Sequence, residues 1–322
     1  MVANSVPESH EDRCIGSFLG TACGDILGAG VEGQSADTIR NRHGEVREVL
    51  DTFRGVGCYT DDTEMTLALA TSLVERGTAD AEDTSLKYAE FYEPRRGYGA
   101  TAHRVMGALQ NGADYRKTGR IEFPNGSFGN GGAMRIAPVG LAYRHASDEM
   151  LHQAVEAALL CTHIHPEAID GAFTQAKAIA ILATSDPNGF DRRQFLETLL
   201  RHSTVFVVQR KLEILLEQSD EGVSDDEVIY TVGNGIRASE AVAASLWAFL
   251  RYGDKPEECL IRAVNFGGDT DTIGAMVGAQ LGSLYGSAWI PSRWYTQIEN
   301  RRHGRDFMID LAKTLARLDI GG

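Results

Sequence analysis

Residues 266–286 read FGGDTDTIGAMVGAQLGSLYG, an acidic motif that leads directly into a long uncharged segment. From Thr272 to Ser292 there is no charged residue, a length that could cross a bilayer. Gln280 and several Ser and Gly residues within the segment, with Asp269 and Asp271 at its start, favour a buried helix of a soluble protein instead. We therefore expect no association with a membrane.

Glycines recur at every fourth residue in two segments of helical pattern. A glycine inside a helix costs about 1 kcal/mol relative to alanine, so a compensating contact is expected. A four-residue step keeps the glycines on one ridge and leaves a groove into which another backbone can pack. We expect these two helices to pack at the centre of the fold, with Asp25 and the Asp269/Asp271 motif near one end. The glycines are Gly16, Gly20, Gly24 and Gly28 in the first segment and Gly274, Gly278, Gly282 and Gly286 in the second.

A second acidic motif, Thr60-Asp61-Asp62-Thr63, lies about 210 residues upstream of the first. Neither motif alone supplies enough ligands for a divalent cation, but together they offer four carboxylates and up to four threonine hydroxyls. Such oxygen ligands suit Mg²⁺ or Mn²⁺ and not zinc. If the fold joins the motifs, a two-metal site follows, with ions about 3.5–4 Å apart that polarise a substrate oxygen and position a water. For each motif taken alone, helix capping with a solvated acidic face is the alternative.

Nearly every periodic run in the rest of the chain is helical. Asp62 to Arg76 has apolar residues on one face, and Asp61 with Glu64 resembles a capping box at its start. Any strand, such as one at 46–50, is short. The sequence therefore predicts an all-α single domain at 14–320, preceded by a disordered leader at 1–13. Further helix starts are indicated by Ser147, Asp191, Ser224 and Pro256.

Composition narrows the class of partner. The net charge of −14 argues against binding to nucleic-acid phosphates, because that binding needs clustered Lys and Arg. An anionic ligand would need local donors. The five cysteines are scattered and show no C-x-x-C spacing, which indicates neither disulfides nor a thiolate metal site and fits a reducing, cytoplasmic location.

A glycine-rich loop, GSFGNGGAMR at 126–135, runs into a predicted helix. Successive backbone N–H groups without large side chains form an anion cradle, and a helix start adds its dipole, so a pyrophosphate would fit. A similar turn, Gly-Asn-Gly-Ile, follows at 233–236. Ordinary helix-entry loops are the plain alternative. His163 is expected to contact a ligand and His165 to be structural, because no third histidine nearby supports a metal site at these two residues.

Two other interpretations of the acidic motif can be compared with the sequence. A calcium loop beginning at Asp269 would need a bidentate Glu at its twelfth position, where Gln280 stands, so that interpretation fails. Asp-Thr-Asp-Thr also looks like the nucleophile motif of haloacid-dehalogenase-type phosphatases. That motif follows an apolar strand near the chain start, whereas here Asn265-Phe266-Gly267-Gly268 precedes it, so the phosphatase stays a second choice.

Six motifs, in this order over roughly residues 15–294, resemble the ADP-ribosylglycohydrolase family. The family's fold is an orthogonal bundle of α-helices that holds two Mg²⁺ ions, with Mn²⁺ as an alternative here. The matching stretches are Gly24-Asp25 followed by Glu32, residues 59–63, Ser127 to Arg135, Thr162-His163, residues 233–236 and residues 268–272.

The resemblance implies a role for each matching residue. Glu32 would be the acid in proton transfer, and Asp62, itself a metal ligand, could be the base. The implied metal ligands are Thr60, Asp61, Asp62, Asp269, Asp271 and Thr272. The implied contacts to ADP-ribose are Ser127, Phe128, Gly129, Asn130, Gly131, His163, Asn234, Gly235 and Ile236.

The activity implied is hydrolysis of the bond from ribose C1″ to a protein side chain or to another ADP-ribose unit, with release of ADP-ribose. The substrates would be ADP-ribosylated proteins or poly-ADP-ribose. The loop at 127–135 and the turn at 233–236 look more like the serine-type branch, whereas GDILGAGVE at 24–32 looks closer to the arginine-directed bacterial branch. O-linked activity is favoured, with N-linked arginine as the alternative. A structural, crystallin-like protein is a further alternative, against which the full set of acidic residues counts.

Overall fold

The computed structural model describes residues 7, 9–218 and 222–321, and the described residues fold as helices joined by loops. The predicted all-α class is confirmed. No strand is present at 46–50, and the described residues contain only two isolated β-bridges. The helices are α1 (His10–Gly28), α2 (Ala36–His43), α3 (Asp61–Arg76), α4 (Ala81–Phe91), η1 (Pro94–Arg96), α5 (Ala100–Gln110), α6 (Tyr115–Thr118), η2 (Asn130–Arg135), α7 (Ala137–Ala142), α8 (Asp148–Leu159), α9 (Pro166–Thr184), α10 (Arg192–His202), α11 (Phe206–Glu217), α12 (Asp225–Val232), α13 (Ala238–Tyr252), α14 (Pro256–Val264), α15 (Thr270–Tyr285), α16 (Ser292–Tyr295) and α17 (Arg305–Leu315).

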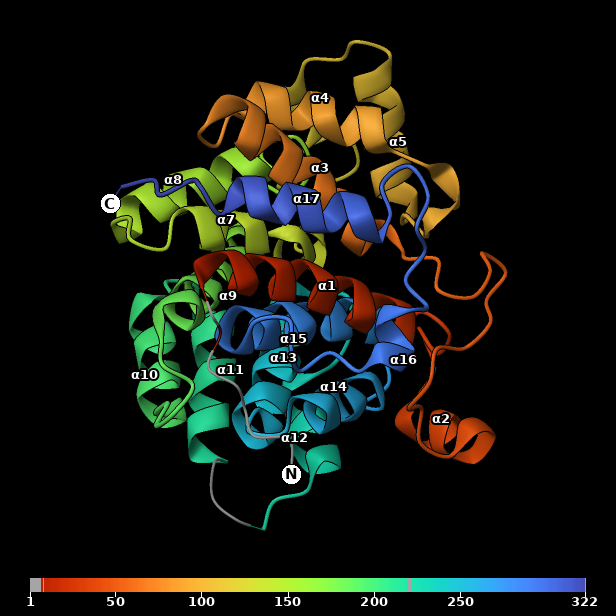
Figure 1. The fold of residues 1–322 in the computed structure, drawn as a ribbon. Helices are drawn as coiled ribbons and strands as arrows, with labels where there is room; N and C mark the ends of the chain where they lie inside the picture. The colour runs from red at the N-terminus through yellow and green to blue at the C-terminus, as the bar shows by residue number, and fades with distance from the viewer. Residues whose placement is uncertain (1–6, 8, 219–221, 322) are drawn as a thin grey trace.

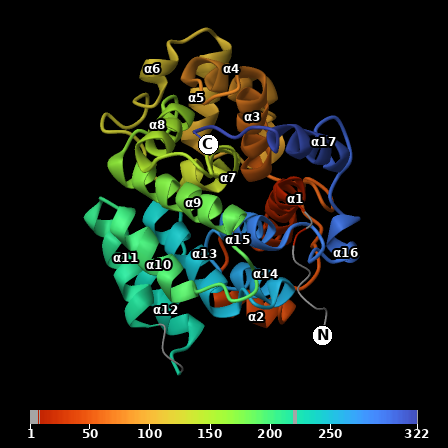
Figure 2. The same cartoon turned by 60° about the vertical axis from the view of Figure 1, so that its left-hand side comes forward.

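Helices α1 and α15 lie side by side at the centre of the molecule (Figures 1 and 2). Their glycine ridges face each other. A Cβ on Gly20 would overlap the carbonyl of Gly278, and a Cβ on Gly24 would overlap the carbonyl of Gly274. The predicted central pair is therefore confirmed, and its backbones approach as closely as they do because both ridges carry only hydrogen atoms.

The remaining helices cover this pair on two sides. Helices α3, α4, α5 and α17 lie above it in Figure 1, and α13 and α14 lie below it, towards α12. Every residue of α15 is buried, which accounts for its uncharged sequence. The buried apolar residues form one connected cluster that includes α1, α3, α9, α13 and α15. None of the helices of the described residues is long and apolar enough to span a membrane.

Two predicted boundaries need correction. The N-cap of α3 is Thr60, whose hydroxyl accepts from the Asp62 N–H, so Asp61 is the first helical residue and no Asp61/Glu64 capping box forms. Helix α1 begins at His10, because Ser9 caps it, so residues 10–13 of the predicted leader are helical. Residues 1–6 and 8 of the leader lie outside the described residues. The other predicted caps are confirmed, at Ser147, Asp191 and Ser224, with Pro256 in the first turn of α14.

The glycine contact between α1 and α15 gives a direct test of its contribution to stability. Gly20→Ala is expected to lower the free energy of unfolding by about 1–3 kcal/mol, because its methyl group displaces the α15 backbone. The matched control is Gly107→Ala in α5, where a Cβ meets no atom within 4 Å and where we expect a gain of about 0.4–1 kcal/mol. Urea unfolding followed by circular dichroism measures both. Equal effects of the two substitutions would contradict the close contact.

Candidate active site

Loops from distant parts of the chain meet at the end of the α1–α15 pair. The loop after α1 is bonded to the turn before α15, because Gly33 donates its N–H to the carbonyl of Gly268 and Gly268 donates to that of Gln34, each over 2.8 Å. These bonds hold Glu32 beside the turn that carries Asp269. The loop of Glu32 is therefore fixed to the acidic motif through the backbone.

The same backbone pairing continues to the glycine-rich loop. Asp269 donates its N–H to the carbonyl of Asn234 over 2.8 Å. Asn130 then donates to the carbonyl of Ile236 over 2.9 Å, and Ala238 donates to that of Phe128 over 3.0 Å. Four segments, of which the outermost, at Gly33 and Asp269, are 236 positions apart, are thus joined by backbone hydrogen bonds. They form one wall of a cleft.

The opposite wall is the first turn of α3, and Asp25 of α1 holds it in place. The buried Asp25 carboxylate accepts from the Thr60 N–H at 2.9 Å, from the Thr63 N–H at 3.1 Å and from the Thr63 hydroxyl at 2.5 Å. Because α1 also packs on α15, one aspartate fixes the start of α3 relative to the acidic turn. The sequence placed Asp25 near this end without giving it a role.

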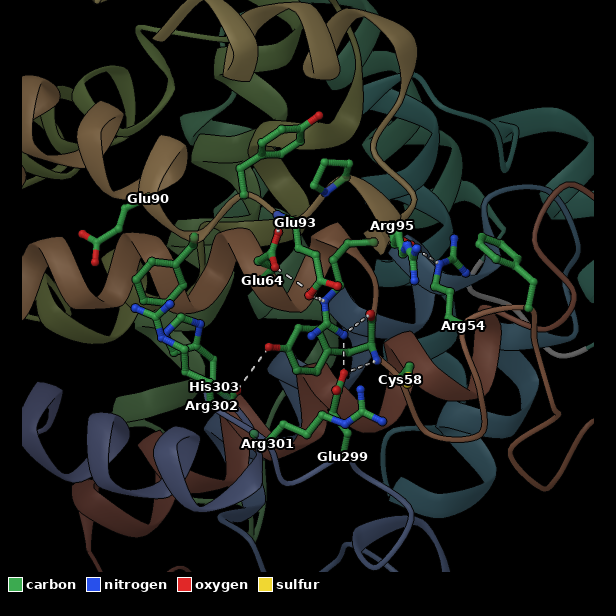
Figure 3. Close-up of a pocket in the computed structure, with 17 residues that line it drawn as sticks. Arg54, Cys58, Glu64, Glu90, Glu93, Arg95, Glu299, Arg301, Arg302 and His303 are labelled. Carbon is green, nitrogen blue, oxygen red and sulfur yellow. Dashed lines mark hydrogen bonds and ion pairs between the residues drawn. The ribbon is translucent and has the colours of Figure 1, made fainter. Parts of the chain in front are cut away.

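Tyr59, the residue before the α3 cap, is held on both sides of its peptide unit. Its N–H donates to Glu299 over 3.2 Å, and its carbonyl accepts from the Arg96 guanidinium over 2.9 Å (Figure 3). The same guanidinium lies 3.9 Å from the centre of the Tyr59 ring and forms an ion pair with Glu299. Arg96 and Glu299 therefore position the acidic motif from outside the cleft. Neither residue belongs to a sequence motif, and Arg96 and Glu299 lie 37 and 240 positions from Tyr59 along the chain, so nothing in the sequence indicated their role.

The cleft between these walls has a volume of about 380 Å³. Most of the predicted site residues line it. Residues that no motif indicated also line it, chiefly Gly97, Gly99–Ala102, Val105 and Phe123. The predicted residues that do so are Glu32, Asp61, Asp62, Ser127, Phe128, Gly129, Asn130, Gly131, His163, Ile236, Asp269, Asp271 and Thr272.

Carboxylates crowd together at the base of the cleft. Oxygen atoms of Glu32, Asp269 and Asp271 lie within 4.8 Å of one another, an arrangement that could hold a metal ion. Asp62 lies beside them, and its Oδ1 atom is buried with no hydrogen-bond partner among the described residues. An unpartnered buried carboxylate oxygen is costly unless a cation or a proton satisfies it. The donor set is composed of oxygen atoms, so it fits a hard divalent cation.

The crowding changes the acidity of these groups. Burial, followed by the charge of Asp61, raises the pKa of Asp62 well above its ordinary value, and burial followed by the charge of Asp62 does the same to the pKa of Asp271. Burial also raises the pKa of Asp61 to about 8. Burial and then the negative charge of Asp269 raise the pKa of Glu32, and the nearby charge of Arg54 partly opposes this rise.

The threonines contribute less to the cleft than the sequence indicated. Thr63 donates its hydroxyl to Asp25, and Thr270 donates its hydroxyl to the Gly28 carbonyl over 2.9 Å. Thr60, a predicted metal ligand, donates to Asp62 over 3.2 Å and does not line the cleft. Only Thr272 among the four lines it. Threonines at helix starts often satisfy nearby backbone and carboxylate groups, which is what three of these do.

The glycine-rich loop lies over His163. A Cβ on Gly131 would lie 2.7 Å from the ring carbon Cε1 of His163, so the loop needs glycine there. Burial, with the charge of Arg135, lowers the pKa of His163 to about 3, which makes the ring neutral at physiological pH. His165 is structural as predicted, since its Nδ1 accepts from the Glu167 N–H at the start of α9.

Some backbone N–H groups of the predicted anion cradle already donate hydrogen bonds within the protein. Gly129 donates its N–H to the Ser127 hydroxyl over 3.1 Å, and Asn130 donates its N–H to Ile236. The Asn130 side chain donates to Asp269 over 2.6 Å, so this residue connects the loop to the acidic cluster. The loop enters a 3₁₀ helix, η2, and not an α-helix. Backbone N–H groups in the first turn of such a helix have no partner within the helix.

Two predicted contact residues do not line the cleft. Asn234 accepts the Asp269 N–H through its carbonyl and donates from its side-chain amide to the Phe266 carbonyl over 2.9 Å. The N–H of Gly235 donates to Glu240 over 3.2 Å. Asn234 therefore supports the acidic turn from outside the cleft, while Gly235 is bonded to α13 through Glu240. Ile236, which does line the cleft, is 69% exposed at its rim.

Comparison with known proteins agrees with this geometry. The sequence model described as ADP-ribosylglycohydrolase matches residues 6–321. The chain belongs to the ADP-ribosylglycohydrolase family. It is therefore a hydrolase of the glycosidase type, and ADP-ribosyl hydrolysis is its general class of reaction. A solved structure titled ADP-ribosylglycohydrolase-related protein complex superimposes with a TM-score of 0.73 and 30% identity, over 97% of this chain and 99% of that one.

Relatives come from more than one branch of the family. ADP-ribosylhydrolase ARH3 of Bos taurus is 32% identical over 89% of this chain and 88% of its own length. ADP-ribosyl-[dinitrogen reductase] glycohydrolase of Rhodospirillum rubrum is 30% identical over 91% and 92%. An uncharacterized protein of Archaeoglobus fulgidus is 33% identical over 96% and 98%.

The phosphatase interpretation is wrong. In haloacid-dehalogenase-type enzymes the Asp-x-Asp motif follows a strand, whereas here α14 precedes it and the described residues contain no strand. The crystallin-like alternative is also disfavoured, because family membership indicates an enzyme.

The raised pKa values predict a particular dependence of stability on pH. The folded state of the metal-free protein holds protons on carboxylates that the unfolded state releases near their ordinary pKa of 3.8. Its free energy of unfolding should therefore fall as the pH rises from about 5 to 8. Thermal unfolding in EDTA across this range measures the slope, and Asp61→Asn should flatten it. A stability that is constant or rising towards pH 8, with no effect of Asp61→Asn, would contradict the shifts.

Proposed function

We propose that this chain is a Mg²⁺-dependent hydrolase that releases ADP-ribose from ADP-ribosylated protein side chains, with the serine O-linkage favoured. The observation that carries the proposal is the cluster of Glu32, Asp269 and Asp271 within 4.8 Å, with the unpartnered oxygen of Asp62 beside it. Poly-ADP-ribose, whose units are also joined through C1″, is a second substrate of the same chemistry.

Two divalent cations, Mg²⁺ or Mn²⁺, would be held by oxygen atoms from both acidic motifs. Asp61 and Asp62 would bind from the α3 side, and Asp269, Asp271 and Thr272 from the α15 side. Thr60 would support the site through its bond to Asp62. When bound, such cations polarise ribose hydroxyls and supply a water of lowered pKa.

The chain's own groups would hold the rest of the substrate. The diphosphate would lie against the glycine-rich loop, near Ser127 and the first turn of η2, where backbone N–H groups are free of intrahelical partners. The neutral His163 can exchange a hydrogen bond with a ribose hydroxyl without adding charge. Phe128 offers a ring face at the rim, with the Arg237 guanidinium 4.5 Å from its centre.

Glu32 is suited to proton transfer. Its raised pKa keeps a larger fraction of the carboxyl protonated near neutral pH, so it can give a proton to the leaving oxygen as the C1″ bond breaks. Asp62, which bound cations would keep ionised despite its raised pKa, would take the proton of the attacking water. The remaining carboxylates would stabilise the positive charge that develops on the sugar ring.

The arginine N-linkage is the second candidate. It is favoured by the GDILGAGVE stretch at 24–32 and by the 30% identity to the Rhodospirillum rubrum glycohydrolase. The serine linkage is supported by SFGNGGAMR at 127–135 and by the ARH3 relatives.

The two linkages can be separated in one experiment. A serine-ADP-ribosylated peptide and an arginine-ADP-ribosylated peptide are each incubated with the protein, in Mg²⁺ and in EDTA, and released ADP-ribose is quantified. Release from the serine peptide in Mg²⁺ alone is expected. Release only from the arginine peptide would show that the arginine N-linkage is the substrate. Release that persists in EDTA would show that hydrolysis does not require a metal.

Asp271→Ala tests whether the two acidic motifs form one metal site. The variant should lose most Mg²⁺ binding in titration calorimetry and about 10³-fold or more in kcat, because metal ligands contribute several kcal/mol to catalysis. The control is Asp310→Ala, an exposed aspartate of α17 far from the cleft. Mg²⁺ affinity and turnover equal to those of the unmodified protein would contradict the joint site.

Glu32→Gln tests proton transfer separately from binding. The amide keeps the size of the side chain but cannot donate a carboxylic proton, so kcat should fall by about 10²–10⁴-fold while ADP-ribose still binds. Single-turnover kinetics and calorimetry with ADP-ribose measure the two effects. A variant that binds and turns over normally would exclude Glu32 from the mechanism.

A further inference from the structure

A second cavity lies on the other side of the first turn of α3 from the catalytic cleft. It has a volume of about 470 Å³ and lies between η1, the loop at 53–58 and the loop that leads into α17 (Figure 3). None of the motifs described above accounts for it. Its lining carries five arginines, Arg54, Arg95, Arg96, Arg301 and Arg302, in a protein whose net charge is −14.

The carboxylates of this cavity are already paired. Glu64, Glu93 and Glu299 all form ion pairs with one guanidinium, that of Arg96. The fourth carboxylate, Glu90, pairs with Lys87 over 3.2 Å. Arg96 therefore serves the folded structure, as its bond to Tyr59 also shows.

The other four arginines form no ion pair of this kind, although the charge of Arg54 also acts on Glu32 in the catalytic cleft, where it opposes the rise in the pKa of that carboxyl. Among the described residues no carboxylate lies within 4.0 Å of the guanidinium of Arg54, Arg95, Arg301 or Arg302, and Figure 3 shows all four around the cavity. The guanidinium of Arg54 donates to the Arg95 carbonyl over 3.1 Å, which holds it at the rim. Unpaired guanidinium groups at one cavity are the usual means of binding phosphate oxygens, because their N–H groups match them in pairs.

An aromatic surface accompanies the charge. Phe53 is 85% exposed, and the Arg54 guanidinium lies 4.6 Å from the centre of its ring. An exposed phenyl ring next to an arginine is a surface on which a nucleobase can stack. Arginines beside an aromatic ring thus fit an anion that carries both phosphates and a base.

The cavity adjoins the catalytic cleft through Arg54 and Gly97. Gly97 lines the cleft and packs directly against the Arg54 guanidinium, and a Cβ on Gly97 would lie 3.6 Å from Oδ1 of Asp61. A chain of linked units that has its end in the cleft would therefore pass Arg54 and reach the second cavity.

We propose that this cavity is a second binding site, for a nucleoside diphosphate, with Arg54, Arg95, Arg301 and Arg302 on the phosphates and Phe53 under the base. The ligand has two sources, a free nucleotide or the next ADP-ribose unit of a substrate chain. The second source rests on the proposed function. The binding of a nucleoside diphosphate to this cavity does not rest on the proposed function. The binding proposal and the proposed function can therefore fail separately.

The first experiment measures binding without turnover. ADP is titrated into the protein presaturated with ADP-ribose, in Mg²⁺ and at fixed ionic strength. ADP should bind to the unmodified protein, and R301A/R302A should weaken that binding by about tenfold or more. The matched control is R42A/R317A, which removes two exposed arginines that are also without carboxylate partners among the described residues, and which should bind as the unmodified protein does.

Absence of ADP binding, or equal binding by both double variants, would overturn the proposal. So would binding of a glutamate-rich peptide at this site in place of ADP, since that would assign the arginines to an acidic protein partner. None of these outcomes depends on hydrolysis, so a failure of the proposed function leaves this test intact.

The second experiment separates the two sources. The KM for ADP-ribose oligomers is compared with that for a singly ADP-ribosylated peptide. If the cavity holds the next unit of the chain, R301A/R302A should raise the ratio of the two KM values by about tenfold. If a free nucleotide is the ligand, the ratio should stay constant while added ADP changes the rate of the unmodified protein only. If the ratio of KM values stays constant and ADP has no effect on the rate, the cavity binds neither the next ADP-ribose unit nor a free nucleotide.

Discussion

The close approach of α1 and α15 is the constraint on which the rest of the structure depends. At Gly28 the two backbones are so near that Thr270 donates its hydroxyl to the Gly28 carbonyl. Glu32 follows four residues after Gly28, and Asp271 follows Thr270, so both reach the same place. A pair of helices held apart by ordinary side chains, with axes about 8–10 Å apart, would separate these carboxylates by several ångströms more. Dispersion contacts along the seam offset the propensity cost of the glycines.

The close contact between α1 and α15 also explains how several carboxylates can lie together in one cleft. Carboxylates packed together repel each other, and burial raises their pKa values further, so the cluster destabilises the fold unless a cation balances its charge. A rigid frame must oppose this repulsion. Here it comes from Asp25 at the start of α3, from the Arg96 and Glu299 pair behind Tyr59, and from the backbone bonds between the loops. Rigid support of this kind keeps metal ligands in place before a cation arrives.

The sequence was informative where a pattern has a single physical cause. Glycines at a spacing of four required a close helix contact, and an uncharged run with polar residues required a buried helix; both were found. Adjacent Asp and Thr residues were less informative, because a hydroxyl beside a helix start can bind an ion or complete a local bond. Thr63 and Thr270 do the latter. Asn234 is similar, since an Asn in a turn can bond to its neighbours as well as to a ligand, and here its side chain donates to the Phe266 carbonyl.

Residues that act across the fold could not be predicted at all. Nothing in Glu299 or Arg96 marks them as supports for Tyr59, and the residues at 99–102 that close the cleft belong to no motif. The arginines around the second cavity could not be predicted either, because they too are brought together only by the fold. In a chain of net charge −14, several unpaired arginines can face one cavity only if the carboxylates of that cavity are paired with other residues. At the second cavity three of the four glutamates form ion pairs with Arg96. The neighbouring arginines are therefore available to bind an anion from solution.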